Sequence, residues 1–359
     1  MKQTKSIIFV TVSMGGGGTE RVISILANHY CKLNIPVTIL MIADNCVAYE
    51  LDERIQIVNV SKATGGSLAG RIKRITGLRK FFKQNPEADI IAMGTVAAMF
   101  TLLAKMGLKQ KVVISERNDP NRLNHKPISR SAKILRNFLY RGARTIVLQT
   151  EDVKKCFPDY LVDKSVVIPN PISSSIPEVR LNAEREKTVI TAGRLTEQKN
   201  HKLLINAFSV FHKNHPEYRL NIYGKGELED ELKSYIKMIN MENVISICGF
   251  CDDLYTKLQT SGMYVSSSNW EGISNSLIEA LAFGIPTIAT DCPVGGSRMF
   301  IRNMENGILI KINDEEALTD AMCRIADKQE FASELGKKAV EIREQLAVET
   351  IADKWLSLF

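Results

Sequence analysis

Two glutamates, Glu271 and Glu279, stand eight residues apart in a stretch that reads W-E-G-I-S-N-S-L-I-E-A-L-A. The small polar residues between them are typical of a loop that turns into a helix, whose first amide groups attract anions. Eight residues span roughly 12 Å in a helix, whereas the carboxylates of a glycosidase lie about 5–9.5 Å apart. The spacing therefore disfavours hydrolysis by a carboxylate pair. It favours a sugar and a ribose at the two ends of one ligand, with the amides of residues 273–277 facing phosphates between them.

A purely structural interpretation of the same stretch is open. Ser276-x-x-Glu279 has the form of a capping box, in which the two side chains satisfy amides at a helix start. This alternative accounts for Glu279 but not for Glu271 or the loop.

A second charged loop, G-R-L-T-E-Q-K-N-H over residues 193–201, directly follows the apolar run Thr188–Ala192. In open parallel sheets, ligands bind beyond the carboxyl ends of strands. Arg194 can bind a diphosphate in bidentate fashion and Lys199 as a point charge. The loop therefore predicts a diphosphate site, although a charged loop after a strand is common in proteins that bind nothing there.

A glycine-rich turn, M-G-G-G-G-T-E-R over residues 14–21, follows the first apolar run. Its glycines allow a close approach of backbone to a phosphate or sugar at a helix start. It lacks the Lys-Ser/Thr of a P-loop, and Glu20 stands where a dinucleotide fingerprint has its third glycine. A flexible turn without a ligand is the alternative.

These loops need strands to position them, and apolar, β-branched runs alternate with helical patterns along the whole chain. Continuous apolar runs indicate parallel strands covered on both faces, hence βαβ units. The predicted strands are 6–12, 37–43, 55–60, 89–93, 111–115 and 145–149, then 188–192, 219–223, 244–248, 263–267, 285–290 and 308–311. A stretch rich in proline and serine, 169–177, separates the two sets, which predicts two doubly wound α/β domains.

Composition supports a globular protein of two domains. The chain has 359 residues, 45% hydrophobic and 24% charged, which excludes disordered and collagen-like classes. The seven cysteines are odd in number and scattered, which favours a reducing cytoplasm. No apolar run reaches the roughly 18 residues of a membrane span. We expect the N-terminal apolar run to be a first strand and not a signal peptide.

Charge is divided unevenly between the halves. Residues 1–168 carry 26 Lys and Arg against 13 Asp and Glu, a net +13. Residues 169–359 carry 21 against 27, a net −6, which leaves the chain at +7. A basic half suggests an anionic partner, either a membrane or a nucleic acid.

Taken together, these motifs resemble those of retaining GT-B glycosyltransferases of family 4, whose E-x7-E motif matches Glu271 and Glu279. The resemblance covers nearly the whole chain. It also includes the glycine-rich turn, the 193–201 loop, Tyr223-Gly224-x-Gly226-Glu227, Gly249-Phe250, Ala282-x-Gly284-x-Pro286 and Asn306-Gly307. The stretch I-S-E-R-N-D-P, residues 114–120, further resembles bacterial members that extend polyprenyl-diphosphate oligosaccharides.

The resemblance implies an α/β fold of the GT-B type, with two Rossmann-like, doubly wound domains facing across a cleft. Residues 1–168 and a C-terminal helix at about 345–359 would form the acceptor-binding, membrane-facing domain. Residues 169–344 would bind the nucleotide-sugar donor.

The resemblance also implies roles for single residues. Glu271 would bind donor-sugar hydroxyls and Glu279 the ribose, while Arg194 and Lys199 would bind the diphosphate. The other donor contacts implied are Gly16, Gly17, Gly249, Phe250, Gly272, Ile273, Ser274, Asn275, Ser276 and Leu277. Relatives often have a histidine in the loop after the fifth strand, but here Glu116, Arg117 and Asn118 follow Ser115. On this acceptor side, Arg117 would either contact an acceptor phosphate or support the loop.

Two basic segments contain no acid. Eight Lys and Arg lie between Glu53 and Glu87, and seven lie between Asp119 and Glu151. Leu68, Ile72, Ile75, Leu78 and Phe82 share one helical face, so residues 68–82 form either a basic interfacial helix or an ordinary core-facing one. In an acceptor domain we favour an anionic membrane surface, with Arg71, Lys73, Arg74, Arg79 and Lys80 as its contacts.

The sequence therefore predicts a retaining hexosyltransferase at the inner face of the cell membrane. It would move a hexose or N-acetylhexosamine from a UDP-sugar to a lipid-linked oligosaccharide or another cell-surface polysaccharide precursor. No cofactor or metal is expected, because no Asp-x-Asp run or spaced His pair occurs. The alternatives are a nucleotide-sugar epimerase of the same fold and a non-enzymatic protein that binds nucleic acid or membranes. The few aromatics in the basic segments disfavour nucleic acid.

Overall fold

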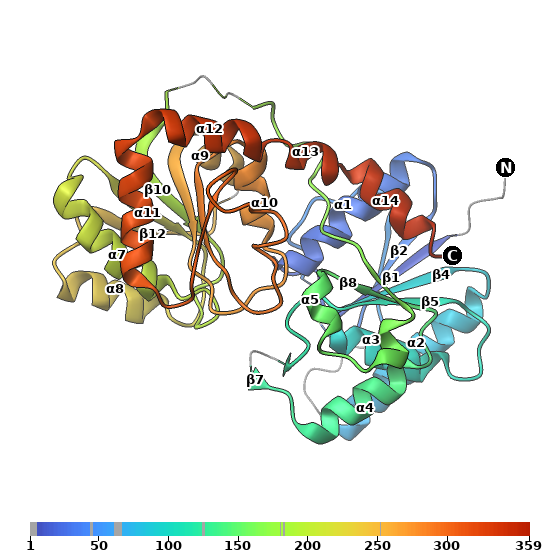
Figure 1. The fold of residues 1–359 in the computed structure, drawn as a ribbon. Helices are drawn as coiled ribbons and strands as arrows, with labels where there is room; N and C mark the ends of the chain where they lie inside the picture. Colours follow the sequence, from blue (N-terminus) through green and yellow to red (C-terminus); the bar gives the residue numbers. More distant parts are fainter. Residues whose placement is uncertain are drawn as a thin grey trace. The chain divides into compact units, whose positions relative to one another are not determined.

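The computed structural model divides the chain into two compact units. It describes residues 6–43, 46–60, 67–123, 126–179, 181, 184–251 and 253–359. Unit 1 comprises Met1–Ser173 together with Leu346–Phe359, and unit 2 comprises Ser174–Gln345 (Figure 1). The division falls inside the proline- and serine-rich stretch, a few residues after the boundary predicted at 168/169.

Unit 1 is built on a seven-stranded parallel sheet with the strand order β3-β2-β1-β4-β5-β8-β9. The strands are β1 (Ile7–Thr11), β2 (Val37–Met41), β3 (Gln56–Asn59), β4 (Asp89–Met93), β5 (Val112–Ser115), β8 (Thr145–Leu148) and β9 (Ser165–Val167). The central strands are buried along their length, as expected from continuous apolar runs. A short antiparallel pair, β6 (Arg122–Leu123) and β7 (Lys126–Pro127), lies outside this sheet.

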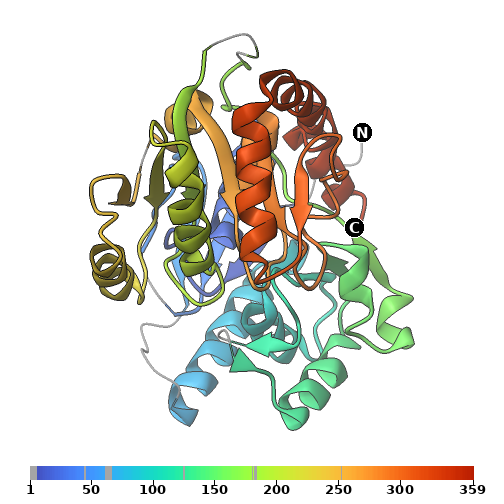
Figure 2. The same ribbon diagram turned by 60° about the vertical axis from the view of Figure 1, so that its left-hand side comes forward.

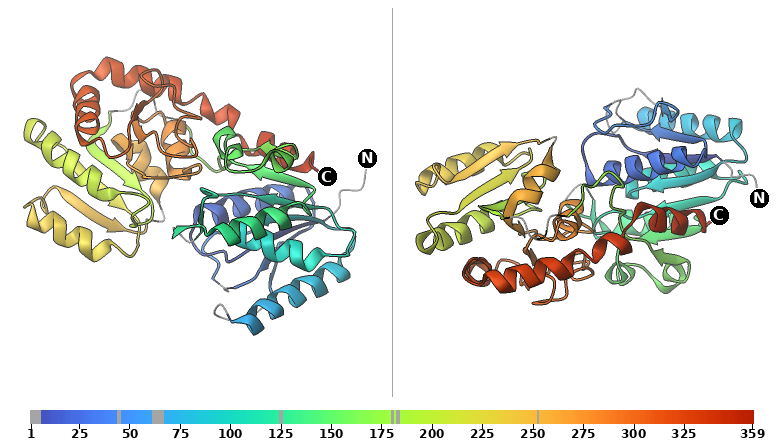
Figure 3. Two further views of the ribbon diagram at one scale, coloured as in Figure 1. Left: turned by 60° about the horizontal axis from the view of Figure 1, so that its bottom comes forward. Right: turned by 90° about the horizontal axis from the view of Figure 1, so that it is seen from above.

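The helices of unit 1 are α1 (Gly18–Lys32), α2 (Leu68–Gln84), α3 (Thr95–Lys105), α4 (Arg130–Tyr140), α5 (Glu151–Lys154), α6 (Asp159–Val162) and α14 (Val348–Leu356). α3 packs between α2 and α4 (Figure 3), whereas α1 packs against α14. The hydroxyl of Tyr30 on α1 donates to the carbonyl of Ala352 at 3.0 Å, which ties the C-terminal helix to this unit.

Unit 2 is built on a six-stranded parallel sheet with the order β12-β11-β10-β13-β14-β15. The strands are β10 (Glu186–Ala192), β11 (Arg219–Tyr223), β12 (Ile245–Gly249), β13 (Ser261–Ser266), β14 (Thr287–Thr290) and β15 (Ile308–Ile310). The strand order reverses direction between β10 and β13, which are direct neighbours. Such a switch point is where open α/β sheets bind ligands.

The helices of unit 2 are α7 (His201–Asn214), α8 (Glu229–Met238), α9 (Leu254–Thr260), α10 (Asn275–Ala282), α11 (Glu315–Asp327), α12 (Gln329–Ala339) and α13 (Ile342–Gln345). α7 and α11 pack side by side against one face of the sheet (Figure 2). Their apolar stripes join the strands in one core that includes Phe208, Phe211, Leu318 and Met322.

The prediction of a GT-B-like pair of doubly wound sheets is confirmed, and the twelve predicted strands are present with ends shifted by a few residues. β9 and the β6–β7 pair were not predicted, because two or three residues carry no readable periodicity. No helix among the described residues has the length and apolar character of a membrane span.

Candidate active site

The candidate site lies at the carboxyl edge of the second sheet, where the loops after β10, β11, β12 and β13 emerge. Gly193 donates its amide to the carbonyl of Tyr223 at 2.9 Å, and Gly224 donates to the carbonyl of Gly249 at 2.7 Å. These bonds hold the loops after β10, β11 and β12 together. The 193–201 loop, the 223–227 motif and Gly249-Phe250 thus meet at one sheet edge.

Lys199 lies at the end of the loop after β10, next to Asn200, whose backbone has the left-handed conformation. Asn200 has φ 45°, and its side-chain oxygen accepts the amide of Leu203 at 3.3 Å, which caps α7. Asparagine adopts this conformation more readily than most residues. The hydroxyl of Ser267, just after β13, donates to the carbonyl of Lys199 at 2.9 Å. The position of Lys199 is therefore fixed from both neighbouring strands.

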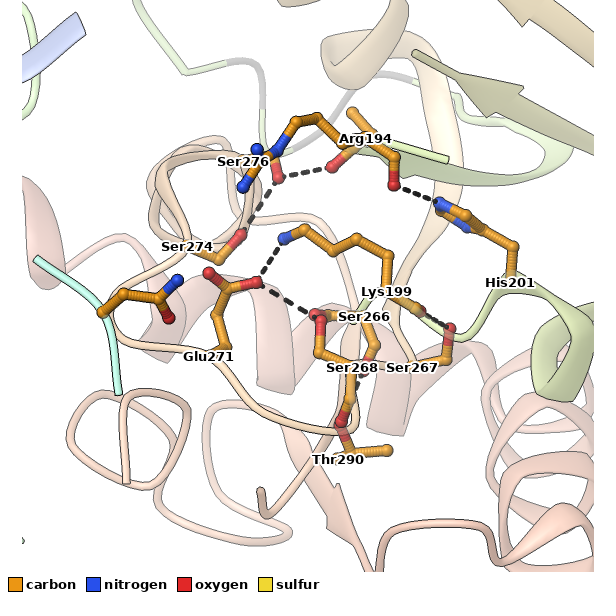
Figure 4. A network of polar contacts seen from close by, with 12 residues as sticks. Arg194, Lys199, His201, Ser266, Ser267, Ser268, Glu271, Ser274, Ser276 and Thr290 are labelled. Atoms are coloured by element: carbon orange, nitrogen blue, oxygen red, sulfur yellow. Dashed lines mark hydrogen bonds and ion pairs between the residues drawn. The ribbon is translucent and has the colours of Figure 1, made fainter. Parts of the chain in front are cut away.

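Lys199 forms an ion pair with Glu271 (Figure 4). Lys199 Nζ lies 2.5 Å from Glu271 Oε2, and both side chains are largely buried, with 15% of each exposed. The Ser268 hydroxyl approaches the same oxygen at 3.4 Å. A charge-assisted bond of this kind is stronger than a neutral one and orders both side chains.

The pair also sets the protonation of Lys199. Burial acts to lower the pKa of Lys199, but the charge and hydrogen bond of Glu271 outweigh burial, so the pKa stands above its usual value. Lys199 is accordingly a cation at neutral pH. A fixed cation next to a carboxylate can hold a diphosphate on one side and sugar hydroxyls on the other.

The start of α10 is held by hydroxyl groups. The Ser276 hydroxyl donates to the carbonyl of Ala192 at 2.8 Å and lies within 2.8 Å of the Tyr264 hydroxyl and 3.1 Å of that of Ser274. The N-cap of α10 is Ser274, with no side-chain cap, so the capping-box alternative for Ser276 is wrong. Because Ser276 bonds tertiary partners instead, the first turn of α10 is aligned with the end of β10. A helix start of this kind presents amides that no carbonyl inside the helix accepts.

Arg194 is a second cation at this sheet edge. Its side chain is exposed, and it makes no hydrogen bond or ion pair with the part of the chain that the structure describes. Figure 4 shows its guanidinium near Ser276, on the same side as the ammonium of Lys199. Two cations and a helix start facing one region can neutralise a departing nucleoside diphosphate.

The other predicted donor residues occupy the same unit. Gly249 has φ 70°, which favours glycine, and Phe250 beside it is an exposed aromatic at the end of β12, suited to stacking on a base. Glu279 is buried on α10. Gly272 and Ile273 lie in the loop between Glu271 and α10. Their roles towards a ligand stay predictions.

Three glycines are required because backbones touch at this edge. A Cβ at Gly224 would lie 1.8 Å from the carbonyl oxygen of Gly193, and one at Gly226 would lie 2.3 Å from that of Leu195. A Cβ at Gly296, in the loop after β14, would lie 1.5 Å from the carbonyl oxygen of Gly272. Gly296 was not among the predicted site residues, although a Gly-Gly pair after a strand was the signal available.

Replacing Gly296 by alanine is expected to displace the loop that carries Glu271. Since the added Cβ collides with backbone and not with a flexible side chain, kcat/KM for the donor falls by roughly tenfold or more, and stability falls by about 1–3 kcal/mol. Gly16→Ala is the comparison for the thermal midpoint alone, because a Cβ there meets nothing closer than Ala48 Cβ at 3.9 Å. An unchanged thermal midpoint and activity in Gly296→Ala would contradict this packing.

His201 supports the Arg194 loop as a neutral residue. It is buried, and its Nε2 lies 3.3 Å from the carbonyl oxygen of Arg194. Burial, followed by the charge of Lys199, lowers the pKa of His201 to about 4. The ring does not need to change charge in order to hold the loop.

This lowered pKa predicts how stability depends on pH. The unfolded ring takes up a proton near its ordinary pKa of about 6.5, whereas the folded ring resists protonation until about pH 4. The contribution of His201 to stability is therefore complete above pH 6.5 and is lost as pH falls towards 4. Denaturant titrations across this range are expected to show a flatter pH dependence for His201→Gln than for the wild type. If the unfolding free energies of His201→Gln and the wild type change in parallel with pH, the neutral state of the buried His201 ring is contradicted.

The remaining predicted residues belong to unit 1. Gly16 and Gly17 form the turn between β1 and α1, and Gly17 is the N-cap of α1. Glu116 is buried, with one carboxylate oxygen accepting the Tyr140 hydroxyl and the other accepting that of Thr95 at 2.8 Å. Glu116 therefore holds α3 and α4 to the end of β5. These contacts are sufficient to explain a carboxylate at this position, and its role on the acceptor side stays a prediction.

Arg117 is the unusual residue of this loop. One guanidinium nitrogen donates to Asn170 Oδ1 at 2.5 Å, but Nε and Nη1 are inaccessible to water and have no partner among the described residues. Burial lowers the pKa of Arg117 to about 10. Buried cationic nitrogens without acceptors are costly, so the interpretation of Arg117 as an anion ligand stays open. Asn118 accepts the amide of Asp119 at 2.9 Å within the loop.

The five basic residues predicted to contact a membrane separate into two groups on α2. Arg71, Lys73 and Lys80 are exposed. Arg74 is buried and donates to the carbonyl of Ile42 at 2.9 Å, so its assignment to the surface is wrong. Arg79 donates to the carbonyls of Ala104 and Met106 at the end of α3. Arg74 and Arg79 thus attach α2 to the fold.

Comparison with known proteins identifies the family. The family model described as "Glycosyltransferase Family 4" matches residues 16–175, and the one described as "Glycosyl transferases group 1" matches residues 173–341. Together they cover most of the chain. The chain belongs to the glycosyltransferases.

Relatives extend over the whole length of the chain. An uncharacterized glycosyltransferase of Haemophilus influenzae is 26% identical, covering 98% of this chain and 99% of its own. A Campylobacter jejuni α-1,4-N-acetyl-D-galactosaminyltransferase, named for a PP-undecaprenol-linked substrate, is 26% identical, with coverages of 98% and 97%. The amylovoran biosynthesis glycosyltransferase AmsD of Erwinia amylovora is 24% identical, with 98% coverage of both chains.

Solved structures show the same fold. HepE of Anabaena, in complex with UDP and glucose, has a TM-score of 0.85 at 17% identity and 98% coverage of both chains. TarM of S. aureus, in complexes that include UDP, has a TM-score of 0.80 at 16% identity and 99% coverage of both. At these identities the likeness establishes the GT-B fold, while the chemistry of this glycosyltransferase has to be argued from its own residues.

Proposed function

We propose that this glycosyltransferase is a retaining enzyme that moves a hexose or N-acetylhexosamine from a UDP-sugar to a lipid-linked oligosaccharide or another cell-surface polysaccharide precursor. The observation that carries the proposal is the Glu271–Lys199 pair, placed at the switch point of the second sheet beside Arg194 and the start of α10. The match of Glu271 and Glu279 to the E-x7-E motif supports retention.

The chemistry follows from the charges at this edge. Breaking the bond between the sugar and UDP leaves negative charge on the diphosphate, which Arg194, Lys199 and the amides of α10 would stabilise. Glu271 would accept hydrogen bonds from the sugar and hold Lys199 in place. We propose that these cations do the work a metal does in other transferases, so that chelators leave the rate unchanged.

The acceptor and the place of action are proposed from the relatives and the charge. The Campylobacter relative acts on a PP-undecaprenol-linked glycan by its name, and unit 1 carries the exposed cations Arg71, Lys73 and Lys80 on α2. We therefore place the enzyme at the inner face of the cell membrane, on an anionic surface.

Reversing the three exposed charges of α2 is expected to weaken binding to anionic vesicles. Each exposed cation near such a surface contributes about 1 kcal/mol, so Arg71→Glu/Lys73→Glu/Lys80→Glu should lower the partition coefficient by roughly 100-fold or more at low salt. The control is Lys202→Glu/Lys213→Glu/Lys237→Glu in unit 2. Vesicle sedimentation that does not separate the two triple variants would contradict the membrane role of α2.

A donor panel tests the proposed function. UDP- and GDP-sugars are each incubated with lipid-linked acceptors, and the product mass is measured. The proposal expects transfer from a UDP-hexose or UDP-N-acetylhexosamine, at a rate about 10²–10³-fold lower in Glu271→Gln. Conversion of a UDP-sugar without an acceptor would indicate an epimerase, and the absence of nucleotide-sugar affinity would indicate a non-enzymatic binder. Either result overturns the proposal.

A further inference from the structure

Helix α4 in unit 1 exposes several large apolar side chains to solvent. Ile134, Leu135 and Phe138 are 62%, 50% and 61% exposed, although they are large hydrophobic side chains within five residues of one another. At about 100° per residue, their directions fall within an arc of roughly 100° on the helix. We call these three residues the α4 ridge. Single exposed hydrophobics are ordinary, but a contiguous group of this kind marks an interaction site.

The buried side of α4, opposite the α4 ridge, carries polar side chains as well as apolar ones. Arg136 is fully buried, donates to the carbonyl of Pro120 at 2.5 Å and lies over the ring of Phe157 at 4.6 Å. Tyr140, also buried, donates to the carboxylate of Glu116. These contacts fix the rotation of α4, because turning the α4 ridge inward would break the bond of Arg136 to Pro120 and that of Tyr140 to Glu116.

Cations flank the α4 ridge. Arg130 and Arg141 are exposed and point to within about 40° of the edge of this arc, one at each end of the helix. The guanidinium of Arg141 lies 4.7 Å from the ring centre of Tyr160, itself 43% exposed. No Asp or Glu occurs in the sequence between Asp119 and Glu151. Apolar side chains bracketed by long cations and an amphipathic aromatic are the composition of a helix lying in a lipid interface.

The same unit presents a second surface of the same kind. On α2, Leu68 and Ile72 are exposed beside Arg71 and Lys73, and α3 packs between α2 and α4. A protein partner would have to be both apolar and strongly acidic to match these helices. An anionic bilayer supplies both properties in one surface, the acyl region for the ridge and the headgroups for the cations.

We propose that the α4 ridge inserts into the interface of an anionic bilayer and is the main apolar anchor of unit 1, whereas α2 contributes mainly the electrostatic attraction of its cations. This inference refines the membrane part of the proposed function and rests on it. It assigns to Ile134, Leu135 and Phe138 a role that the charge pattern of α2 does not reveal.

The test uses the full chain and vesicles of phosphatidylcholine with and without phosphatidylglycerol. Ile134→Ser/Leu135→Ser/Phe138→Ser is expected to bind anionic vesicles about 100-fold more weakly, and most of the binding that survives high salt should be lost. The matched control is Val210→Ser/Met238→Ser/Ile312→Ser, which removes three exposed apolar side chains from unit 2. Equal vesicle binding by the two triple variants would overturn the proposal.

A spectroscopic measurement locates the ridge directly. In Phe138→Trp, emission is expected to shift to the blue on vesicle binding and to be quenched by brominated lipids, whereas Val210→Trp should not respond. If the emission of Phe138→Trp stays unchanged while the variant still sediments with vesicles, the proposal is overturned. A triple ridge variant that changes only the oligomeric state in sedimentation velocity would also overturn it, because the occupant would then be a second copy of the chain.

Activity on a short, water-soluble acceptor separates this inference from the proposed function. If the ridge variant keeps full transfer to that acceptor and loses vesicle binding, both proposals stand. If no acceptor or donor supports transfer while the ridge still governs vesicle binding, the proposed function fails and the anchor remains. If transfer is intact and vesicle binding ignores the ridge, the anchor alone is wrong.

Discussion

Glu271→Gln is expected to lower kcat by about 10²–10³-fold, the cost of removing one preorganised electrostatic group from an active site. The amide keeps the volume of the carboxylate but not its charge, so it can neither hold Lys199 by an ion pair nor accept hydrogen bonds as strongly from the sugar. The unfolding free energy should fall by about 1–3 kcal/mol, because a largely buried ammonium loses its partner. Single-turnover transfer and thermal midpoints measure the two effects separately.

The control for this variant is Glu197→Gln. Glu197 lies in the same loop as Lys199, but its side chain is exposed. Normal transfer by Glu197→Gln together with a large loss in Glu271→Gln attributes the effect to the pair and not to local charge. Near wild-type turnover in Glu271→Gln would contradict the site assignment.

Lys199→Ala is expected to reduce kcat/KM for the donor by about 10²–10³-fold, through loss of a cation that would face the diphosphate. Unlike Glu271→Gln, it should also weaken the binding of free UDP, because UDP carries the diphosphate but no sugar. Calorimetric titration of UDP into both variants checks this difference. The comparison is Lys202→Ala, whose ammonium in the wild type lies over the ring of Tyr235 on α8.

The two substitutions should not be additive. Because Lys199 and Glu271 act as one unit, the double variant is expected to lose far less activity than the product of the two single losses. Unchanged UDP affinity in Lys199→Ala would contradict its place at the diphosphate. Fully additive losses would contradict the coupling.

Much of the fold could be predicted because its strands are long apolar runs with turns between them. The Glu271–Lys199 pair itself could not, since the two residues are 72 positions apart. The sequence does indicate that Lys199 and Glu271 each lie in a loop that follows a strand. The pairing of β10 with β13 then brings the two loops together, a consequence of strand order that no local pattern contains.

Helix faces were the least predictable feature. The apolar spacing of α2 places Leu68, Ile72, Leu78 and Phe82 on one side, but the buried stripe runs through Gly70, Arg74, Leu78 and Phe82. Arg74 is on the inner side because Ile42 offers it a buried carbonyl. On α4 the same reversal is stronger, since Arg136 is inside. A buried arginine satisfied by carbonyls and rings cannot be told from an exposed one by periodicity alone.

The anomeric configuration of the product shows whether the reaction at the Glu271–Lys199 pair retains the configuration of the donor sugar. The enzyme is supplied with an α-linked UDP-sugar chosen by the donor panel, and the new linkage is assigned by proton NMR, with the slow variant Glu271→Gln as the comparison. Transfer with an α-linkage in the product, strongly reduced in Glu271→Gln, is the predicted result. A β-linked product, or transfer that Glu271→Gln leaves intact, would contradict a retaining reaction at this site.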